Sequence, residues 1–189
     1  MKKCALHSLG CKVNSYETQA MQKMMESAGY EIVPFGEEIA DIYIINTCSV
    51  TNIADRKSRQ MIHKAKKINP EAVVAAAGCY VESAGDNIDE DVDIVIGNNE
   101  KSHLIEILNE YFEHMDKEKS VDIGKATGFD ELNIDSPLEH TRAYVKIQDG
   151  CNRFCSYCII PYVRGRIRSR KPDDVMAEIK RVAASGCKE

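Results

Sequence analysis

The chain has 189 residues, enough for one large domain or two small ones. Its composition, 43% hydrophobic and 29% charged, is that of a folded globular protein and excludes a disordered chain. The net charge of -5 argues against a protein that covers nucleic acid with its whole surface.

Short apolar segments and helical patterns alternate along the first hundred residues. Segments rich in β-branched residues predict strands that are buried on both faces, at 2–9, 31–35, 41–47, 72–78 and 93–97. Apolar stripes with helical spacing predict helices at 15–28, 52–68 and 100–114. This alternation predicts an α/β fold, an open parallel sheet with helices on both faces.

The charge of the chain changes sign near residue 141. Residues 142–171 hold eight basic side chains and one acidic one, which marks a boundary in the chain. We predict that residues 116–140 before this boundary form a connector with one short strand at 120–124. A strand expected at 143–149 and a helix expected at 171–186 restart the strand–helix pattern. The predicted organisation is therefore a domain at 1–115, a connector at 116–140, and the first β/α unit of a second, truncated domain at 141–189.

Eight cysteines occur in a chain that begins without the pattern of a secretory signal peptide. No apolar stretch approaches the ~20 residues needed to span a bilayer. We therefore predict a cytoplasmic protein with no membrane partner, whose reduced thiols serve metal binding or catalysis rather than disulfides. Cys4 falls inside a predicted strand and Cys187 just beyond a predicted helix, and we interpret both as structural.

Three cysteines crowd into the eight positions of "CNRFCSYC", as Cys151, Cys155 and Cys158. Zinc or a disulfide is the alternative, but zinc usually takes four ligands in paired Cys-x-x-Cys form. Ferredoxin-type clusters use tighter triplets and a further Cys-Pro. The spacing therefore predicts an iron–sulfur cluster with one iron that is open to a substrate or cofactor.

Three further cysteines each follow a predicted strand: Cys11 in "SLGCKVN", Cys48 in "INTCSVT" and Cys79 in "AAGCYVE". In an open α/β sheet the carboxyl ends of the strands gather along one edge, where ligands bind. Gly10 and Gly78 would let the backbone come close there. We predict that the three thiols converge on a metal site; the alternative is three unrelated buried thiols.

Arginines alternate along "RGRIRSR", at positions 164, 166, 168 and 170. On an extended segment all four would point the same way and would offer guanidinium groups to an anionic partner. We predict that Arg164 and Arg170 are functional and that Arg166 and Arg168 are solvated. A structurally neutral arginine face is the alternative.

The Cys-x3-Cys-x2-Cys motif after a strand resembles that of the radical S-adenosylmethionine (SAM) enzymes. The resemblance implies a [4Fe-4S] cluster on Cys151, Cys155 and Cys158, whose open iron binds SAM and which cleaves SAM by one-electron transfer. These three cysteines would then be the catalytic residues. Tyr157 would lie near the adenine of SAM, with ordinary packing as the alternative, and Arg164 and Arg170 are the other candidate cofactor-binding residues.

The whole chain resembles the methylthiotransferases, whose Gly-Cys, Asn-Thr-Cys and Gly-Cys stretches hold a second [4Fe-4S] cluster. The resemblance implies replacement of a C–H hydrogen by a methylthio group, with the sulfur held at Cys11, Cys48 and Cys79. "LGCKVNSYETQAM" and "NTCSVTNIADRKSRQ" are most similar to the branch that acts on N6-threonylcarbamoyladenosine. Its partners would be the tRNA anticodon stem-loop, an electron donor such as flavodoxin or ferredoxin, and a sulfur source.

Other functions stay open at this point. Related branches of the family act on isopentenyladenosine in tRNA or on a ribosomal-protein aspartate. A non-catalytic iron–sulfur module for electron transfer or redox sensing would bind iron without cleaving SAM. An isolated fragment of this length would also lack the rest of the SAM-binding barrel and the family's C-terminal RNA-binding domain, and such a fragment can be inactive.

Overall fold

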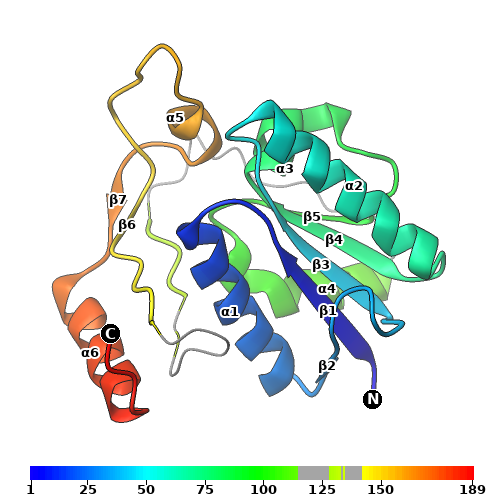
Figure 1. The fold of residues 1–189 in the computed structure, drawn as a ribbon, viewed down its shortest axis with the longest axis horizontal. Helices are drawn as coiled ribbons and strands as arrows, with labels where there is room; N and C mark the ends of the chain where they lie inside the picture. Colours follow the sequence, from blue (N-terminus) through cyan, green and yellow to red (C-terminus); the bar gives the residue numbers. More distant parts are fainter. Residues whose placement is uncertain (115–127, 133, 135–141) are drawn as a thin grey trace.

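The structure, a computed structural model, describes residues 1–114, 128–132, 134 and 142–189 (Figure 1). Its central feature is a parallel sheet of five strands, β1 (Lys3–Ser8), β2 (Glu31–Ile32), β3 (Ile42–Thr47), β4 (Val73–Gly78) and β5 (Ile94–Ile96). The strand order is β2-β1-β3-β4-β5, so the direction in which the chain winds reverses between β1 and β3. The predicted α/β fold with a parallel sheet is confirmed.

Helices cover both faces of this sheet. They are α1 (Lys12–Ser27), α2 (Asn52–Ile68), α3 (Cys79–Ala84) and α4 (Leu104–His114), with short 3-10 helices η1 (Gly85–Asn87) and η2 (Lys101–His103). Helices α1 and α4 pack on one face, whereas α2 and α3 pack on the other (Figure 1). The bounds of α2 are those predicted, whereas α3 is an additional, short helix that the apolar periodicity does not indicate.

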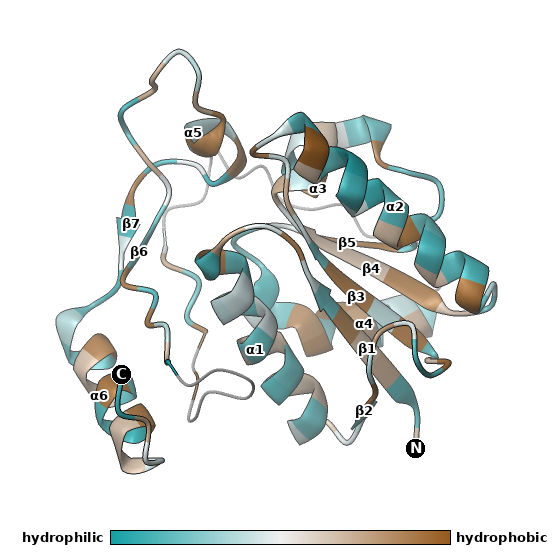
Figure 2. Cartoon of the chain, in the orientation of Figure 1, coloured by the Kyte–Doolittle hydropathy of each residue, from teal (hydrophilic) through white to brown (hydrophobic). Residues whose placement is uncertain are grey.

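The strands are apolar because both of their faces are covered. All six residues of β3 are buried, and Ile42 and Ile44 face the helices α1 and α4 while Tyr43 and Ile45 face α2. Figure 2 shows the same contrast, with apolar strands at the centre and polar residues along the outer side of α2. Burial of each large aliphatic side chain stabilises the fold by roughly 1.5–3 kcal/mol.

The C-terminal segment differs from the expected parallel β/α unit. It contains β6 (Gln148–Asp149), α5 (Ile160–Val163), β7 (Arg168–Ser169) and α6 (Pro172–Ala184). The strand expected over 143–149 is only two residues long, and its partner β7 runs antiparallel to it. The reason is the polar character of this segment: Lys146 and Asp149 are drawn into buried ion pairs instead of an apolar sheet.

The described part of the predicted connector lies against α1. Leu132 and Ile134 form a small apolar cluster with Tyr16 and Ala20. The strand expected at 120–124 lies outside the described residues, and the division at 115 and 140 stays a prediction. Within the described residues, no helix combines the length and the apolar character that crossing a membrane requires.

Candidate metal centres

Three cysteines lie where strands of the sheet end. Cys11 directly precedes α1, Cys48 directly follows β3, and Cys79 is the first residue of α3, directly after β4. Cys48 and Cys79 are buried, whereas Cys11 is exposed. Ligands of open α/β sheets bind at the point where the strand order reverses, and Cys11 and Cys48 flank that point between β1 and β3.

Two glycines allow the loops that carry these cysteines to approach each other. Gly10 has φ +100°, and a Cβ there would lie 2.7 Å from Sγ of Cys48. Gly78 has φ +96°, and a Cβ there would lie 2.5 Å from the carbonyl oxygen of Thr47. Both positions therefore require a residue without a side chain, because of their backbone conformation and because of the space.

Hydrogen bonds from two side chains connect the three loops. The Asn14 side-chain amide donates to the carbonyl oxygens of Leu9 and Thr47, each at 2.7 Å. The Thr47 hydroxyl donates to the carbonyl of Ala77 at 2.5 Å and accepts from the amide of Tyr80 at 3.2 Å. The loops after β1, β3 and β4 are thus held in one frame, which fixes the positions of the cysteines.

The spacing of the cysteine thiols is compatible with a cluster of several irons. Among the described residues, only His63, Asp89 and Asp91 bring three potential ligand atoms within 4.8 Å of one another. Neither cysteine triplet converges that tightly, as thiols do around one zinc ion. In an iron–sulfur cluster each thiolate binds a different iron, so wider spacing is expected. Burial raises the pKa of the Cys79 thiol, and the positive charges of Arg164 and Lys101 oppose that rise.

The second triplet lies in the loop between β6 and α5. Cys155 is exposed and Cys151 and Cys158 are half-buried. The backbone amide of Cys151 donates to Gly165 at 3.0 Å, and that of Cys158 donates to Cys155 at 3.0 Å, so the loop has a defined shape. Tyr157 is 91% exposed, and its placement near a cofactor stays a prediction.

Cys79 of the first set and the loop of the second set are joined to helices that pack against each other. Helix α5, which begins two residues after Cys158, packs against α3, which begins with Cys79 (Figure 1). The Asn98 side-chain amide donates to the carbonyl of Val163 in α5 at 2.6 Å and lies 4.0 Å from Sγ of Cys79. The wall of the Cys79 site is therefore built partly by the segment that carries the second triplet.

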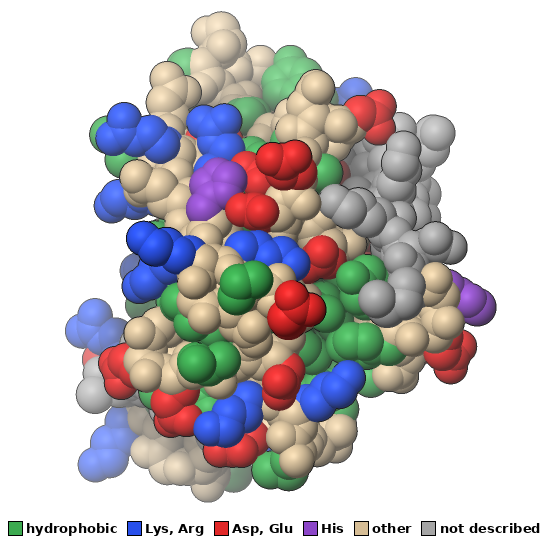
Figure 3. All heavy atoms as spheres, turned by 90° about the vertical axis from the view of Figure 1, so that its right-hand side faces the viewer, with side chains coloured by type: hydrophobic (Ala, Val, Ile, Leu, Met, Phe, Trp, Pro, Cys, Tyr) green, Lys and Arg blue, Asp and Glu red, His purple; other side chains and the backbone are tan. Residues whose placement is uncertain are grey.

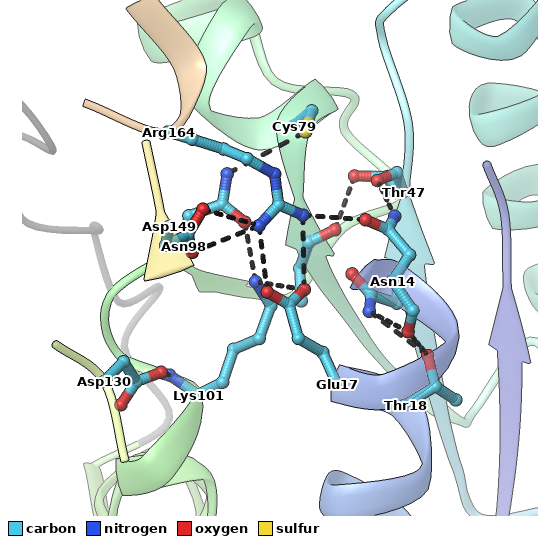
Figure 4. Close-up of polar contacts among 12 residues, drawn as sticks. Asn14, Glu17, Thr18, Thr47, Cys79, Asn98, Lys101, Asp130, Asp149 and Arg164 are labelled. Carbon is cyan, nitrogen blue, oxygen red and sulfur yellow. Dashed lines mark hydrogen bonds and ion pairs between the residues drawn. The ribbon is translucent and has the colours of Figure 1, made fainter. Parts of the chain in front are cut away.

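A buried network of charged side chains lies behind Cys79 (Figure 4). Glu17 is fully buried, and its carboxylate contacts the ammonium groups of Lys146 at 2.7 Å and Lys101 at 3.0 Å. The Arg164 guanidinium lies 2.9 Å from Glu17 and 3.1 Å from Asp149. Glu17 belongs to α1 and Lys101 to η2, whereas the other three residues belong to the C-terminal segment. Of these five residues, only Arg164 was a predicted site residue.

The arginines of "RGRIRSR" do not form a single row. Arg164, Arg168 and Arg170 are buried, whereas Arg166 is exposed and lies over the ring of Phe154 at 4.4 Å. The prediction that all four point the same way is wrong, and so is the prediction that Arg168 is solvated. The segment is not uniformly extended, since α5 ends at Val163 and only Arg168–Ser169 form a strand.

Arg164 and Arg170 are both paired with carboxylates. Arg170 pairs with Glu178 of α6 and, at 2.9 Å, with Glu131. Their guanidinium groups are thus occupied in this structure. Contact of either residue with a cofactor stays a prediction.

The buried network predicts a loss of stability in acid. Burial alone would raise the pKa of Glu17, but Lys101, Arg164 and Lys146 hold that pKa well below its ordinary value of 4.5. Because the pKa is lower in the folded chain than in the unfolded chain, the stabilisation is fully present above about pH 4.5 and is lost as the pH falls through the folded value. Urea unfolding of the chain at several pH values should show this dependence. The slope below pH ~4.5 should be weaker for Glu17→Gln, and an unchanged slope would contradict the assignment.

Substitution of Gly78 should disturb the first cysteine site directly. Gly78→Ala places a Cβ in a backbone conformation used almost only by glycine and against the carbonyl of Thr47, so we expect a loss of at least about 2 kcal/mol in unfolding free energy. Gly29→Ala is the matched control, because Gly29 has φ +87° but no atom within 4 Å of the added Cβ. Urea denaturation compares the two, and equal losses would show that the close approach to Thr47 does not matter.

Comparisons with known proteins divide the chain in two. A model of the uncharacterized protein family UPF0004 matches residues 3–97, and a model of the radical SAM superfamily matches residues 145–189. The first match covers the sheet with Cys11, Cys48 and Cys79, and the second contains Cys151, Cys155 and Cys158.

The chain is also similar over its length to curated proteins. It is 42% identical over 192 residues to "Threonylcarbamoyladenosine tRNA methylthiotransferase MtaB" of Bacillus subtilis (strain 168), covering 100% of this chain and 42% of that protein. The protein of the same name from Aquifex aeolicus (strain VF5) is 42% identical, with 99% and 46% covered. "tRNA-2-methylthio-N(6)-dimethylallyladenosine synthase" of Citrobacter koseri is 33% identical, with 100% and 41% covered. The chain thus spans less than half the length of these relatives.

Proposed function

The chain belongs to the radical-SAM methylthiotransferase family, and from this premise we propose that the protein converts N6-threonylcarbamoyladenosine in tRNA to its 2-methylthio derivative. The observation that carries the proposal is the presence of two sets of three cysteines near adjoining elements, since Cys79 of the first set begins α3 and the loop of the second set leads into α5, which packs against α3. Identity of 42% to relatives with this named activity, against 33% to a relative named for dimethylallyladenosine, favours the threonylcarbamoyl branch.

Two iron–sulfur clusters and SAM would supply the sulfur atom and the one-electron chemistry that an unactivated C–H bond requires. We assign one cluster to Cys11, Cys48 and Cys79 and the other, as the catalytic one, to Cys151, Cys155 and Cys158. Tyr157 is free to contact the adenine of SAM, since it is exposed beside the third of these cysteines. We assign Arg164 and Arg170 to holding their segment against α1 and α6, because carboxylates occupy both guanidinium groups.

The test of this proposal uses full-length protein with reconstituted clusters, a chemical reductant, SAM and tRNA that carries the unthiolated nucleoside. Formation of the 2-methylthio nucleoside supports the proposal. Iron binding without any cleavage of SAM would instead support the non-catalytic electron-transfer or redox-sensing module.

Helix α2 offers the surface that best suits RNA. It carries six Lys or Arg side chains and one acidic side chain, in a chain whose net charge is -5. Arg56, Lys57 and Lys67 are exposed, and within the described residues no carboxylate pairs with them. Figure 3 views the side of the molecule on which α2 lies and shows Lys and Arg side chains gathered along one edge. The helix begins four residues after Cys48, so phosphates bound along it would extend from the first cysteine site.

Charge reversal on α2 should weaken RNA binding. The triple substitution of Arg56, Lys57 and Lys67 by Glu removes three cations that would neutralise phosphates, so we expect weaker tRNA binding and a shallower dependence of the binding constant on salt. Filter binding or anisotropy with full-length protein at several salt concentrations measures both. The control is the same substitution by Glu at three exposed lysines that lie outside α2, namely Lys23, Lys180 and Lys188. Equal effects of the two triples would refute a role specific to α2.

A further inference from the structure

The charge network behind Cys79 has properties that its contribution to folding does not explain. Among the described residues, its ion pairs join three cations, Lys101, Lys146 and Arg164, to two anions, Glu17 and Asp149. A third buried carboxylate, Asp130, lies beside Lys101 but accepts from the backbone amides of Lys101 and Ser102 instead of joining these ion pairs. Removing ions from water costs more than their pairing usually returns, and buried ion pairs that share two anions among three cations are less favourable still. Such an excess charge is stabilised if an anionic group lies nearby.

The first cysteine site is where that anionic group would lie. Arg164 and Lys101 both act electrostatically on Cys79, and Arg164 also donates to the side-chain oxygen of Asn14 at 2.8 Å. Asn14 belongs to the frame that joins the loops of Cys11 and Cys48. Asn98, which lies 4.0 Å from Sγ of Cys79, accepts from the Lys101 ammonium at 2.6 Å. A cluster bound by three thiolates carries net negative charge, and neighbouring charges and hydrogen bonds set its reduction potential.

The residues of the network come from both parts of the chain. Glu17 and Lys101 belong to the part that contains the sheet, whereas Lys146, Asp149 and Arg164 lie on either side of the loop that carries Cys151, Cys155 and Cys158. The excess positive charge therefore exists only when this C-terminal segment is docked. Without it, Glu17 and Lys101 would form a neutral pair.

We propose that docking of the segment from Lys146 to Arg164 completes the first cysteine site, and that Arg164 is a positioning residue whose charge raises the reduction potential of the cluster held there. This inference rests on the proposed function, since it assumes a cluster on Cys11, Cys48 and Cys79. Reduction adds one electron, and so one negative charge, to that cluster. The nearby positive charge stabilises the reduced form more than the oxidised form.

The experiment measures the first cluster alone. Full-length protein with Cys151, Cys155 and Cys158 replaced by Ala leaves only the first triplet to bind iron, and an EPR-monitored titration with dithionite gives the midpoint potential of its cluster. We expect Arg164→Met to lower the midpoint potential and Arg164→Lys, which keeps the charge, to leave it near the parent value. Asp149→Asn increases the excess positive charge and should raise the potential.

The control is Arg170→Met, which removes a buried arginine ion pair of the same segment that is directed at Glu178 and Glu131 instead of the cysteine site. It should leave the potential unchanged. A purely structural network predicts that Arg164→Met and Asp149→Asn shift the potential in the same direction or not at all, and that result would overturn the inference. If Asp149→Asn does not fold, the inference is tested by the difference in midpoint potential between Arg164→Met and Arg164→Lys. If Arg164→Lys does not fold, it is tested by the difference in midpoint potential between Arg164→Met and Arg170→Met. A parent protein that binds no iron at the first triplet would overturn the proposed function itself, and this inference with it.

Discussion

Replacement of Glu17 by alanine is expected to lower the free energy of unfolding of the chain by about 3–5 kcal/mol. The substitution leaves the ammonium groups of Lys101 and Lys146 and the guanidinium of Arg164 buried, with Asp149 as the remaining anion of the network. Ions that are buried without a counter-charge lose their hydration and gain no ion pair in return. Urea denaturation at neutral pH measures the loss.

The control for this substitution is Glu38→Ala. Glu38 forms an ion pair with Lys3 at 2.8 Å, but both side chains are substantially exposed, so the expected loss is only about 0–1 kcal/mol. The comparison separates the effect of burial from that of losing a carboxylate. A loss at Glu17 no larger than the loss at Glu38 would show that the network is not closed from solvent.

Alanine substitution of the two cysteine triplets should produce two different defects in full-length protein. Loss of Cys151, Cys155 and Cys158 would remove the ligands of the cluster to which we assign SAM binding, so cleavage of SAM to 5′-deoxyadenosine should fall to background. Loss of Cys11, Cys48 and Cys79 should leave that cleavage in place but stop formation of the methylthio nucleoside, because the site to which we assign the sulfur would be lost. Chromatographic measurement of 5′-deoxyadenosine and of the nucleoside product distinguishes the two.

The matched control is Cys4→Ala. Cys4 is fully buried inside β1, and burial raises its pKa to about 12, so its thiol is an apolar core group and no ligand. The variant should retain both SAM cleavage and product formation. Production of 5′-deoxyadenosine by the Cys151, Cys155 and Cys158 triple variant would show that the site assignment is wrong.

The sheet and its helices could be predicted because their patterns are local. Strands buried on both faces are uniformly apolar, and helices on a sheet have one apolar stripe, so β3 and α2 were located nearly residue by residue. The strand-end positions of Cys11, Cys48 and Cys79 follow from the same pattern. Helix α3 was missed because six residues contain too few turns for a stripe to be recognised.

The charge network could not be predicted because its partners are far apart in the sequence. Arg164 is 147 residues from Glu17, and Lys146 is 129 residues from it. The sequence does indicate that two of these charged residues are buried. Glu17 lies on the same apolar stripe of its helix as Ala20 and Met21. Lys101 precedes α4 and lies three residues before Leu104, in line with the apolar stripe of that helix. A charge on an apolar stripe indicates a buried partner, although not which one.

The expectation for the arginine segment failed for a different reason. It assumed one extended conformation over residues 164–170, in which side chains alternate regularly. Gly165 has φ +70° and turns the chain after α5, so Arg164 is directed toward Glu17 while Arg166 is exposed. A glycine within an alternating charge pattern thus marks a change of direction that periodicity alone does not show.

The central claim is that this protein adds a methylthio group to N6-threonylcarbamoyladenosine in tRNA. The most direct test is mass spectrometry of tRNA nucleosides from cells that lack the full-length gene. The account predicts that 2-methylthio-N6-threonylcarbamoyladenosine disappears while its unthiolated precursor accumulates. An unchanged level of that nucleoside, with loss of 2-methylthio-isopentenyladenosine or of neither, would contradict the account.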